Sequence, residues 1–285
     1  MVRYPVPRQA LIDAIQQHKP SWLQRAKDRT DIYRNAGAYT GGSEFWGEIK
    51  DVYIQLQHEK CAYCETKLQG AQLASKVHEV EHFRPKSSVN AWPPAGDPFQ
   101  PGWPVGTASA AGYYLLAYHP FNYAIACTRC NSTLKSNYFP VAGTRDIHGG
   151  DPSLMQGEEA LLIYPMSDID DDPTDLIGFE GVTAQARHAS GPKRQRALTT
   201  IRFFQLNHQD LTTRRAEMLG QLYVNLENLA AGPAAPLKAR LETLITKACA
   251  PAGQFSSCMR DFVQLYSSNP GQASTLGQLA LDMTT

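Results

Sequence analysis

The sequence predicts an α+β protein in which a small mixed centre lies between two helical regions. Three observations support this fold class: apolar residues recur at helical spacing near both ends, two short extended runs occupy the middle, and two Cys-x-x-Cys pairs flank them. The length of 285 residues suits one large domain or two modest ones. We expect a helical lead-in over 1–43, a central domain over 44–145 and a mostly helical region over 146–285.

Composition and charge narrow the class of protein. With 42% hydrophobic and 19% charged residues the chain can bury a core. No apolar run approaches the ~20 residues that span a bilayer, and the start lacks the apolar stretch of a secretory signal, so we expect a cytoplasmic protein without membrane contact. The zero net charge argues against a globally basic coat, although the basic run from Arg187 to Arg202 could contact phosphates or could form a solvated face.

The first third of the chain should be helical. Residues 1–36 carry apolar side chains at helical spacing, interrupted by Pro20. After Gly41-Gly42, Ser43 is expected to cap an amphipathic helix that ends near 58–60 and delivers Cys61.

The middle and the end of the chain follow a different pattern. We expect strands at 76–83 and 122–126, a long loop over 87–111, and a short helix over 128–135. A further strand is expected at 161–164. From Arg194 onward the chain should be helical, with Asp210 capping a long helix that Gly232-Pro233 ends, and with helices near 236–249 and 254–267.

The two Cys-x-x-Cys pairs point to a metal site. Cys61, Cys64, Cys127 and Cys130 supply the four thiolates of a tetrahedral zinc ion with no open position, which is typical of a structural rather than a catalytic site. In a reducing compartment such pairs are more often metal ligands than disulfides. Cys249 and Cys258 lie in helical sequence and are expected to be ordinary small apolar residues.

Glu81, His82 and Asn131 suggest a second, catalytic site. Histidine has the pKa range of a general base, and a glutamate suits a hard cation such as Mg²⁺ or Mn²⁺. Hydrolysis of a phosphodiester needs both a base and such a cation. Asn131 follows the second cysteine pair and could complete the metal site with Glu81, whereas Glu-His alone would carry little information.

Four further polar residues are candidates for supporting roles. Asn122, just ahead of the second strand, could tie the intervening loop by side-chain hydrogen bonds. Lys135, Arg84 and Lys86 could contact phosphates, although each could equally be a solvated side chain.

These residues resemble the zinc-bearing branch of the HNH (His-Me finger) endonucleases. The likeness extends to a narrower group that includes the nuclease subunit of the Septu anti-phage system and retron-associated relatives. It is specific over 44–140 and looser to about residue 215. It is carried by residues 61–65, 81–86, 112–118, 127–135 and 138–140, together with Asn122.

The resemblance implies a ββα-metal core. It assigns His82 as the general base, Glu81 as the metal-binding acid, Asn131 as the last motif position and Asn122 as the central structural asparagine. It also implies a role in bacterial anti-phage defence and an ATPase partner encoded nearby. The group commonly has a tryptophan just before the central asparagine, where this chain has Pro120-Phe121, so the local packing is expected to differ.

The function expected from the sequence is therefore endonucleolytic cleavage of DNA with structural zinc and catalytic Mg²⁺ or Mn²⁺. Two alternatives stay open. One is a non-catalytic zinc-knuckle module that binds nucleic acid or protein, and the other is an RNA- or tRNA-cleaving HNH effector.

Overall fold

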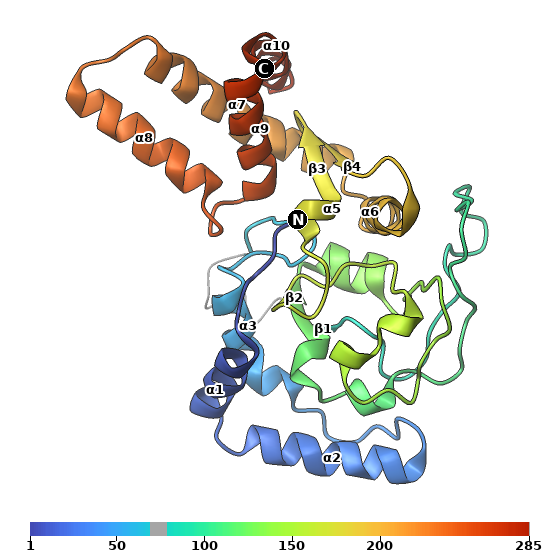
Figure 1. The fold of residues 1–285 in the computed structure, drawn as a ribbon. Coiled ribbons are helices and arrows are strands. Elements are labelled where there is room, and N and C mark those ends of the chain that lie inside the picture. The colour runs from blue at the N-terminus through green and yellow to red at the C-terminus, as the bar shows by residue number, and fades with distance from the viewer. Residues whose placement is uncertain (69–78, 285) are drawn as a thin grey trace.

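The computed structural model describes residues 1–68 and 79–284 (Figure 1). The chain begins with α1 (Arg8–His18) and α2 (Trp22–Ala36), which Pro20 separates as expected. Helix α2 ends at Gly37, which adopts the left-handed φ of 65° that glycine tolerates best. The helical structure expected over 1–36 is therefore present.

The helix expected after Ser43 starts later and has two parts. A 3₁₀ turn η1 (Trp46–Ile49) runs into α3 (Lys50–Leu56), and Ser43 makes no capping hydrogen bond to it. The helix ends before 58–60 because His58 and Glu59 adopt positive φ angles of 53° and 57°. This tight exit turns the chain directly into Cys61.

The centre of the fold is an antiparallel strand pair followed by a short helix. Strand β1 (Glu79–His82) pairs with β2 (Tyr123–Ala126), with Glu81 opposite Ala124 and His82 opposite Tyr123. The second expected strand is thereby confirmed. The first is confirmed over its last residues, and the rest of that prediction, 76–78, lies outside the described residues. A short π-helix, η4 (Arg129–Lys135), follows β2 where a helix was expected.

The long loop over 87–111 contains no helix and only isolated bridges, as its proline content predicted. It is nevertheless anchored, because Trp92 packs 5.6 Å from Phe203 and the Trp103 indole donates to Thr199 Oγ1. The 3₁₀ turns η2 (Tyr114–Leu116) and η3 (Pro120–Asn122) then lead into β2.

The segment after the centre departs from the sequence prediction. The run 161–164 is buried but is not a strand, since the backbone N–H of Tyr164 donates to the Asp170 side chain rather than to a neighbouring strand. The residues of this apolar run are buried without forming a strand. The apolar pattern alone cannot distinguish such a buried segment from a buried strand. The 3₁₀ turns η5 (Pro152–Leu154) and η6 (Gln156–Glu158) precede it, and a small unit that the sequence analysis missed follows: α5 (Pro173–Leu176), β3 (Ile177–Glu180) and β4 (Thr183–Ala186).

The rest of the described chain is helical, as predicted. It comprises α6 (Gly191–Phe203), α7 (Gln209–Ala230), α8 (Ala235–Cys249), α9 (Ser256–Ser268) and α10 (Pro270–Asp282), the last of which was not expected. His208, not Asp210, caps α7, because its Nδ1 accepts from the Asp210 N–H. Figure 1 shows α7 to α10 grouped away from the β1–β2 centre, with α6, β3 and β4 between them. None of the helices in the described part of the chain is long and apolar enough to cross a membrane.

An aromatic cluster joins the N-terminal helices to the strand pair. The Trp22 ring lies 6.0 Å from Phe45, 6.3 Å from Tyr118 and 6.2 Å from Tyr123 of β2. The apolar core continues from these residues into 146–285. The boundaries proposed at 43 and 145 remain predictions.

Candidate metal centre and catalytic cavity

The four cysteines of the two Cys-x-x-Cys pairs meet in one cluster. The Sγ atoms of Cys61, Cys64, Cys127 and Cys130 all lie within 4.8 Å of one another, and only Cys127 is more than slightly exposed. The first pair sits in a tight turn that the Ala62 N–H fixes by donating to the Ile125 carbonyl of β2 at 2.9 Å. The turn and the end of β2 therefore present their sulfurs to a common point.

The charge balance of this cluster fits a bound cation. Burial raises the pKa of the Cys61 thiol, whereas hydrogen bonds with Cys127 and Cys130 hold the pKa of Cys64 well below its usual range. Four sulfurs at this spacing cannot all ionise without a compensating positive charge. Four sulfur ligands and no open position are the donor set of structural Zn²⁺, so the cluster fits the predicted zinc site.

Glu65, directly after Cys64, is a buried anchor that the sequence analysis missed. Its carboxylate lies 2.6 Å from the Met1 ammonium and 3.4 Å from Lys60 Nζ, and it accepts from Ser256 Oγ of α9 at 3.1 Å. Burial raises the pKa of Glu65, but the Met1 and Lys60 charges outweigh it and hold that pKa below its usual range. The cysteine turn is thus tied to α9, a contact that no local pattern could reveal.

A separate cavity of about 520 Å³ brings the predicted catalytic residues together. Glu81 and His82 at the end of β1 line it with Asn131 of η4 and Lys86. Lys86 Nζ lies 4.6 Å from the centre of the Trp46 ring, on the same wall. The other lining residues are Glu44, Gly47, Lys50, Val80, Pro85, Ser132, Ser136 and Asn137.

His82 is held in one orientation. Its Nε2 lies 3.0 Å from the carbonyl oxygen of Ala117, and Trp46 and Tyr123 pack edge-on at 4.8 and 5.1 Å. Because a carbonyl oxygen only accepts, the proton resides on Nε2 and Nδ1 carries the lone pair. Burial lowers the pKa of His82 to about 3, so the imidazole is neutral at physiological pH.

Glu81 is a buried carboxylate beside Lys135, and Lys86 also attracts its charged form. Lys135 Nζ lies 3.3 Å from Oε1, yet the alignment is too poor for a hydrogen bond and Oε1 accepts none. Burial raises the pKa of Glu81 to about 7 and outweighs the attraction of Lys135 and Lys86. An incompletely satisfied buried carboxylate that lines a polar cavity is suited to hold a hard divalent cation.

Lys135 and Arg84, which the sequence analysis considered as phosphate contacts, do not face this cavity. Lys135 is fully buried against Glu81. The Arg84 Nε donates to Glu158 Oε2 at 2.8 Å, and Arg84 lines a different cavity. Buried carboxylates draw both cations inward, and the sequence spacing gave no sign of those partners. Of the three basic candidates, Lys86 lines the candidate catalytic cavity.

Asn122 ties the loop after β1 to the turn before β2. Its Oδ1 accepts from the Arg84 N–H at 2.7 Å, and its Nδ2 donates to the carbonyls of Arg84 and Leu116 at 3.0 and 3.1 Å. The side chain is completely buried, so these three bonds fix the backbone two residues beyond His82.

Comparison with known proteins gives one informative relative. The chain is 30% identical over 170 residues to the Septu protein PtuB of Bacillus mycoides (strain KBAB4). The match covers 60% of this chain and 50% of the relative, so the chain spans about half the length of the curated protein that it matches. Neither a family model nor a solved structure matches.

Proposed function

We propose that this chain is a metal-dependent HNH (His-Me finger) endonuclease that hydrolyses phosphodiester bonds of DNA. The observation that carries the proposal is that Glu81, His82 and Asn131 line one polar cavity, although Asn131 lies 49 positions beyond His82 in the sequence. A module that only bound nucleic acid would have no need for all three side chains at one place.

His82 would act as the general base. Its Nδ1 would take the proton of the attacking water, while the Ala117 carbonyl steadies the imidazolium that forms by accepting from Nε2. The packing of Trp46 and Tyr123 restricts rotation of the ring, so the lone pair keeps its direction. The low pKa keeps the base unprotonated in neutral solution, at the cost of a weaker driving force for proton transfer.

Glu81 and the side-chain amide of Asn131 would hold Mg²⁺ or Mn²⁺. The buried Oε1 without a hydrogen bond and the oxygen-rich lining fit such a hard cation. When bound, the ion supplies charge stabilisation to the leaving oxygen of the phosphodiester. Lys86, held against Trp46 on the cavity wall, would contact the phosphate, and the cysteine cluster would hold zinc that keeps β2 and η4 in place.

We further propose that the nuclease serves in bacterial anti-phage defence. The support is the similarity to the Septu protein PtuB over 60% of this chain. The resemblance of the sequence motifs to Septu-type nucleases adds an expectation: an ATPase encoded nearby is the working partner.

The test is plasmid nicking in Mg²⁺ or Mn²⁺, with and without that ATPase, by wild type, His82→Ala and the control His18→Ala. His18 is an exposed residue at the end of α1, remote in sequence from the cavity. We expect His82→Ala to lose about 10²-fold or more in rate. Zinc content should be equal in all three proteins, and His18→Ala should cleave like wild type.

The outcomes separate the alternatives. Equal nicking by wild type and His82→Ala removes His82 as the base. Cleavage of RNA or tRNA alone would replace DNA as the substrate. If neither the plasmid nor RNA is cleaved with any partner or metal, the result would favour the non-catalytic zinc-knuckle module.

A further inference from the structure

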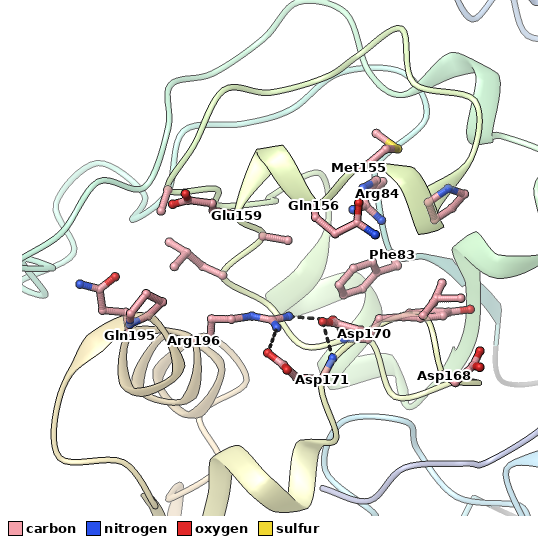
Figure 2. Close-up of a pocket in the computed structure, with 17 residues that line it drawn as sticks. Phe83, Arg84, Met155, Gln156, Glu159, Asp168, Asp170, Asp171, Gln195 and Arg196 are labelled. Atoms are coloured by element: carbon pink, nitrogen blue, oxygen red, sulfur yellow. Dashed lines mark hydrogen bonds and ion pairs between the residues drawn. The ribbon is translucent and has the colours of Figure 1, made fainter.

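A second cavity, of about 410 Å³, lies on a different part of the molecule (Figure 2). The two residues just after β1, the segment from Ala142 to Asp171 and the start of α6 line it, and it shares no lining residue with the proposed catalytic cavity. Phe83, Met155, Leu161 and Tyr164 give it buried apolar walls. Its volume is in the range of small-molecule sites, which run from about 300 to 1,000 Å³.

Two arginines with unused hydrogen-bond donors line this cavity. The Arg84 side chain is 7% exposed and its Nε is taken by Glu158, but within the described chain neither of its Nη atoms has an acceptor. Arg196 uses both Nη atoms on Asp170 and Asp171, while its buried Nε has no partner among the described residues. Figure 2 shows these two side chains at different ends of the cavity. The Arg84 Nη atoms are not among the fully buried atoms that lack a partner, so they can donate to water or to a ligand in the cavity, whereas the buried Arg196 Nε is a costly unpaired donor.

The charge around the cavity limits what that ligand can be. Glu159, Asp168, Asp170 and Asp171 line it with Arg84 and Arg196, so the carboxylates outnumber the guanidinium groups. A polyphosphate would meet net repulsion here. The cavity suits a nearly neutral, flat molecule that accepts hydrogen bonds on one edge and donates them on another.

We propose that this cavity binds guanine, presented as a nucleoside. The Nη pair of Arg84 offers adjacent donors to O6 and N7, the pairing that arginine makes with guanine in nucleic-acid complexes. The carboxylates would accept from N1–H and the exocyclic amine, and the base would lie against the apolar walls of Phe83 and Tyr164. Adenine presents an amino group where guanine has O6, so it would oppose a donor with a donor.

The site is independent of the proposed nuclease chemistry, although it lies against the same strand. Arg84 follows His82 by two residues, and the Asn122 side chain forms hydrogen bonds with the N–H and the carbonyl of Arg84. A ligand on Arg84 would therefore contact the segment that directly follows β1. Binding itself can be measured without any cleavage.

The proposal can be tested by isothermal titration calorimetry of the full chain with guanosine and with adenosine. We expect guanosine to bind about tenfold or more tightly than adenosine, given ~1–3 kcal/mol for a bidentate arginine pair. Gln195→Trp, on the cavity wall in α6, should weaken guanosine binding to a similar degree by filling the entrance. Lys193→Trp, an exposed position on the same helix outside the cavity, is the matched control and should bind like wild type.

The substitution Arg84→Lys is a second test of the proposed guanosine site. Lysine keeps the charge near Glu158 but lacks the planar donor pair, so guanosine affinity should fall about tenfold. If this buried substitution unfolds the chain, Gln195→Trp, at a partly exposed position, decides. Three results would overturn the proposal: no guanosine binding at millimolar concentration, equal affinity for adenosine, or unchanged affinity in Gln195→Trp.

Discussion

Burial changes the proton affinity of neighbouring residues in opposite directions along β1. The pKa of Glu81 rises to about 7 and that of His82 falls to about 3, because burial disfavours the charged form of each. Burial therefore favours two neutral side chains over an ion pair between them. Lys135 offsets part of the cost at Glu81, which gives this lysine an electrostatic role in place of the phosphate contact considered from its sequence position.

His119 provides a measurable pH dependence of stability, and it lies outside the proposed catalytic cavity. Burial lowers its pKa to about 4, and its Nδ1 accepts from the Phe121 N–H. Since the unfolded chain has a histidine pKa of about 6.5, it binds more protons than the folded chain between these values. The free energy of unfolding should therefore fall as pH drops below about 6.5, by up to about 2 kcal/mol near pH 5 for this residue.

Urea unfolding of wild type and His119→Asn at about pH 7 and pH 5 checks this expectation. Asparagine can still offer an acceptor to Phe121 but does not titrate, so the variant should lose less stability on acidification. The comparison between the two proteins removes the opposing contribution of Glu81, whose raised pKa makes acidification favourable between about pH 7 and 4.5. Parallel pH profiles would contradict the assignment to His119.

At the scale of secondary-structure elements, the strand pair and η4 are short and depend on side-chain bonds for their placement. Strands of four residues make few ladder bonds, so the segment between them must be held by other means. Asn122 supplies that link by joining the backbone after β1 to the Leu116 carbonyl of η2. A buried amide that bonds on both edges is well suited because backbone donors and acceptors are both present.

Asn122→Ala should be strongly destabilising. It leaves the buried N–H and carbonyl of Arg84 without the Asn122 partner, while the Leu116 carbonyl keeps only its bond from the His119 N–H. At about 1–3 kcal/mol for an unsatisfied buried group, we expect a loss of about 3 kcal/mol or more. The control is Asn137→Ala, since that partly buried side chain makes a single bond to Ser88 Oγ and should cost about 1 kcal/mol. Urea midpoints measure both, and equal losses would refute the role given to Asn122.

At the scale of the whole molecule, the cysteine cluster connects parts that are distant in sequence. It joins the turn at Cys61 to the end of β2, and Glu65 next to it reaches Met1 and α9. Metal bound there would contribute to the free energy of folding, because the site does not exist in the unfolded chain. Loss of the metal should therefore destabilise both the strand pair and the helical region.

Cys61→Ser should abolish zinc binding and lower the unfolding temperature. Wild type is expected to contain one zinc ion per chain, and Cys249→Ser, a half-buried cysteine outside the cluster, should retain it. Elemental analysis and thermal unfolding of the three proteins measure both quantities. A Cys61→Ser protein that keeps its zinc and its melting temperature would exclude the cluster as a structural zinc site.

The sequence by itself determined the features that local spacing encodes. Helices at both ends follow from apolar periodicity, the irregular loop over 87–111 from its prolines, and the pairing of two Cys-x-x-Cys turns from ligand chemistry. The pattern of apolar residues wrongly predicted a strand at 161–164, where the residues are buried without forming one. It also did not predict the β3–β4 hairpin. Short strands carry too few residues for their period to be distinctive.

Only the tertiary structure decided which polar side chains share a cavity and which are paired with buried carboxylates instead. Glu81, His82 and Asn131 meet because β1 pairs with β2 and η4 follows directly, whereas Lys135 and Arg84 turn inward to Glu81 and Glu158. The Ala117 carbonyl that sets the His82 tautomer lies 35 residues away. Such long-range contacts depend on how the segments pack, and burial then sets the charge of each group.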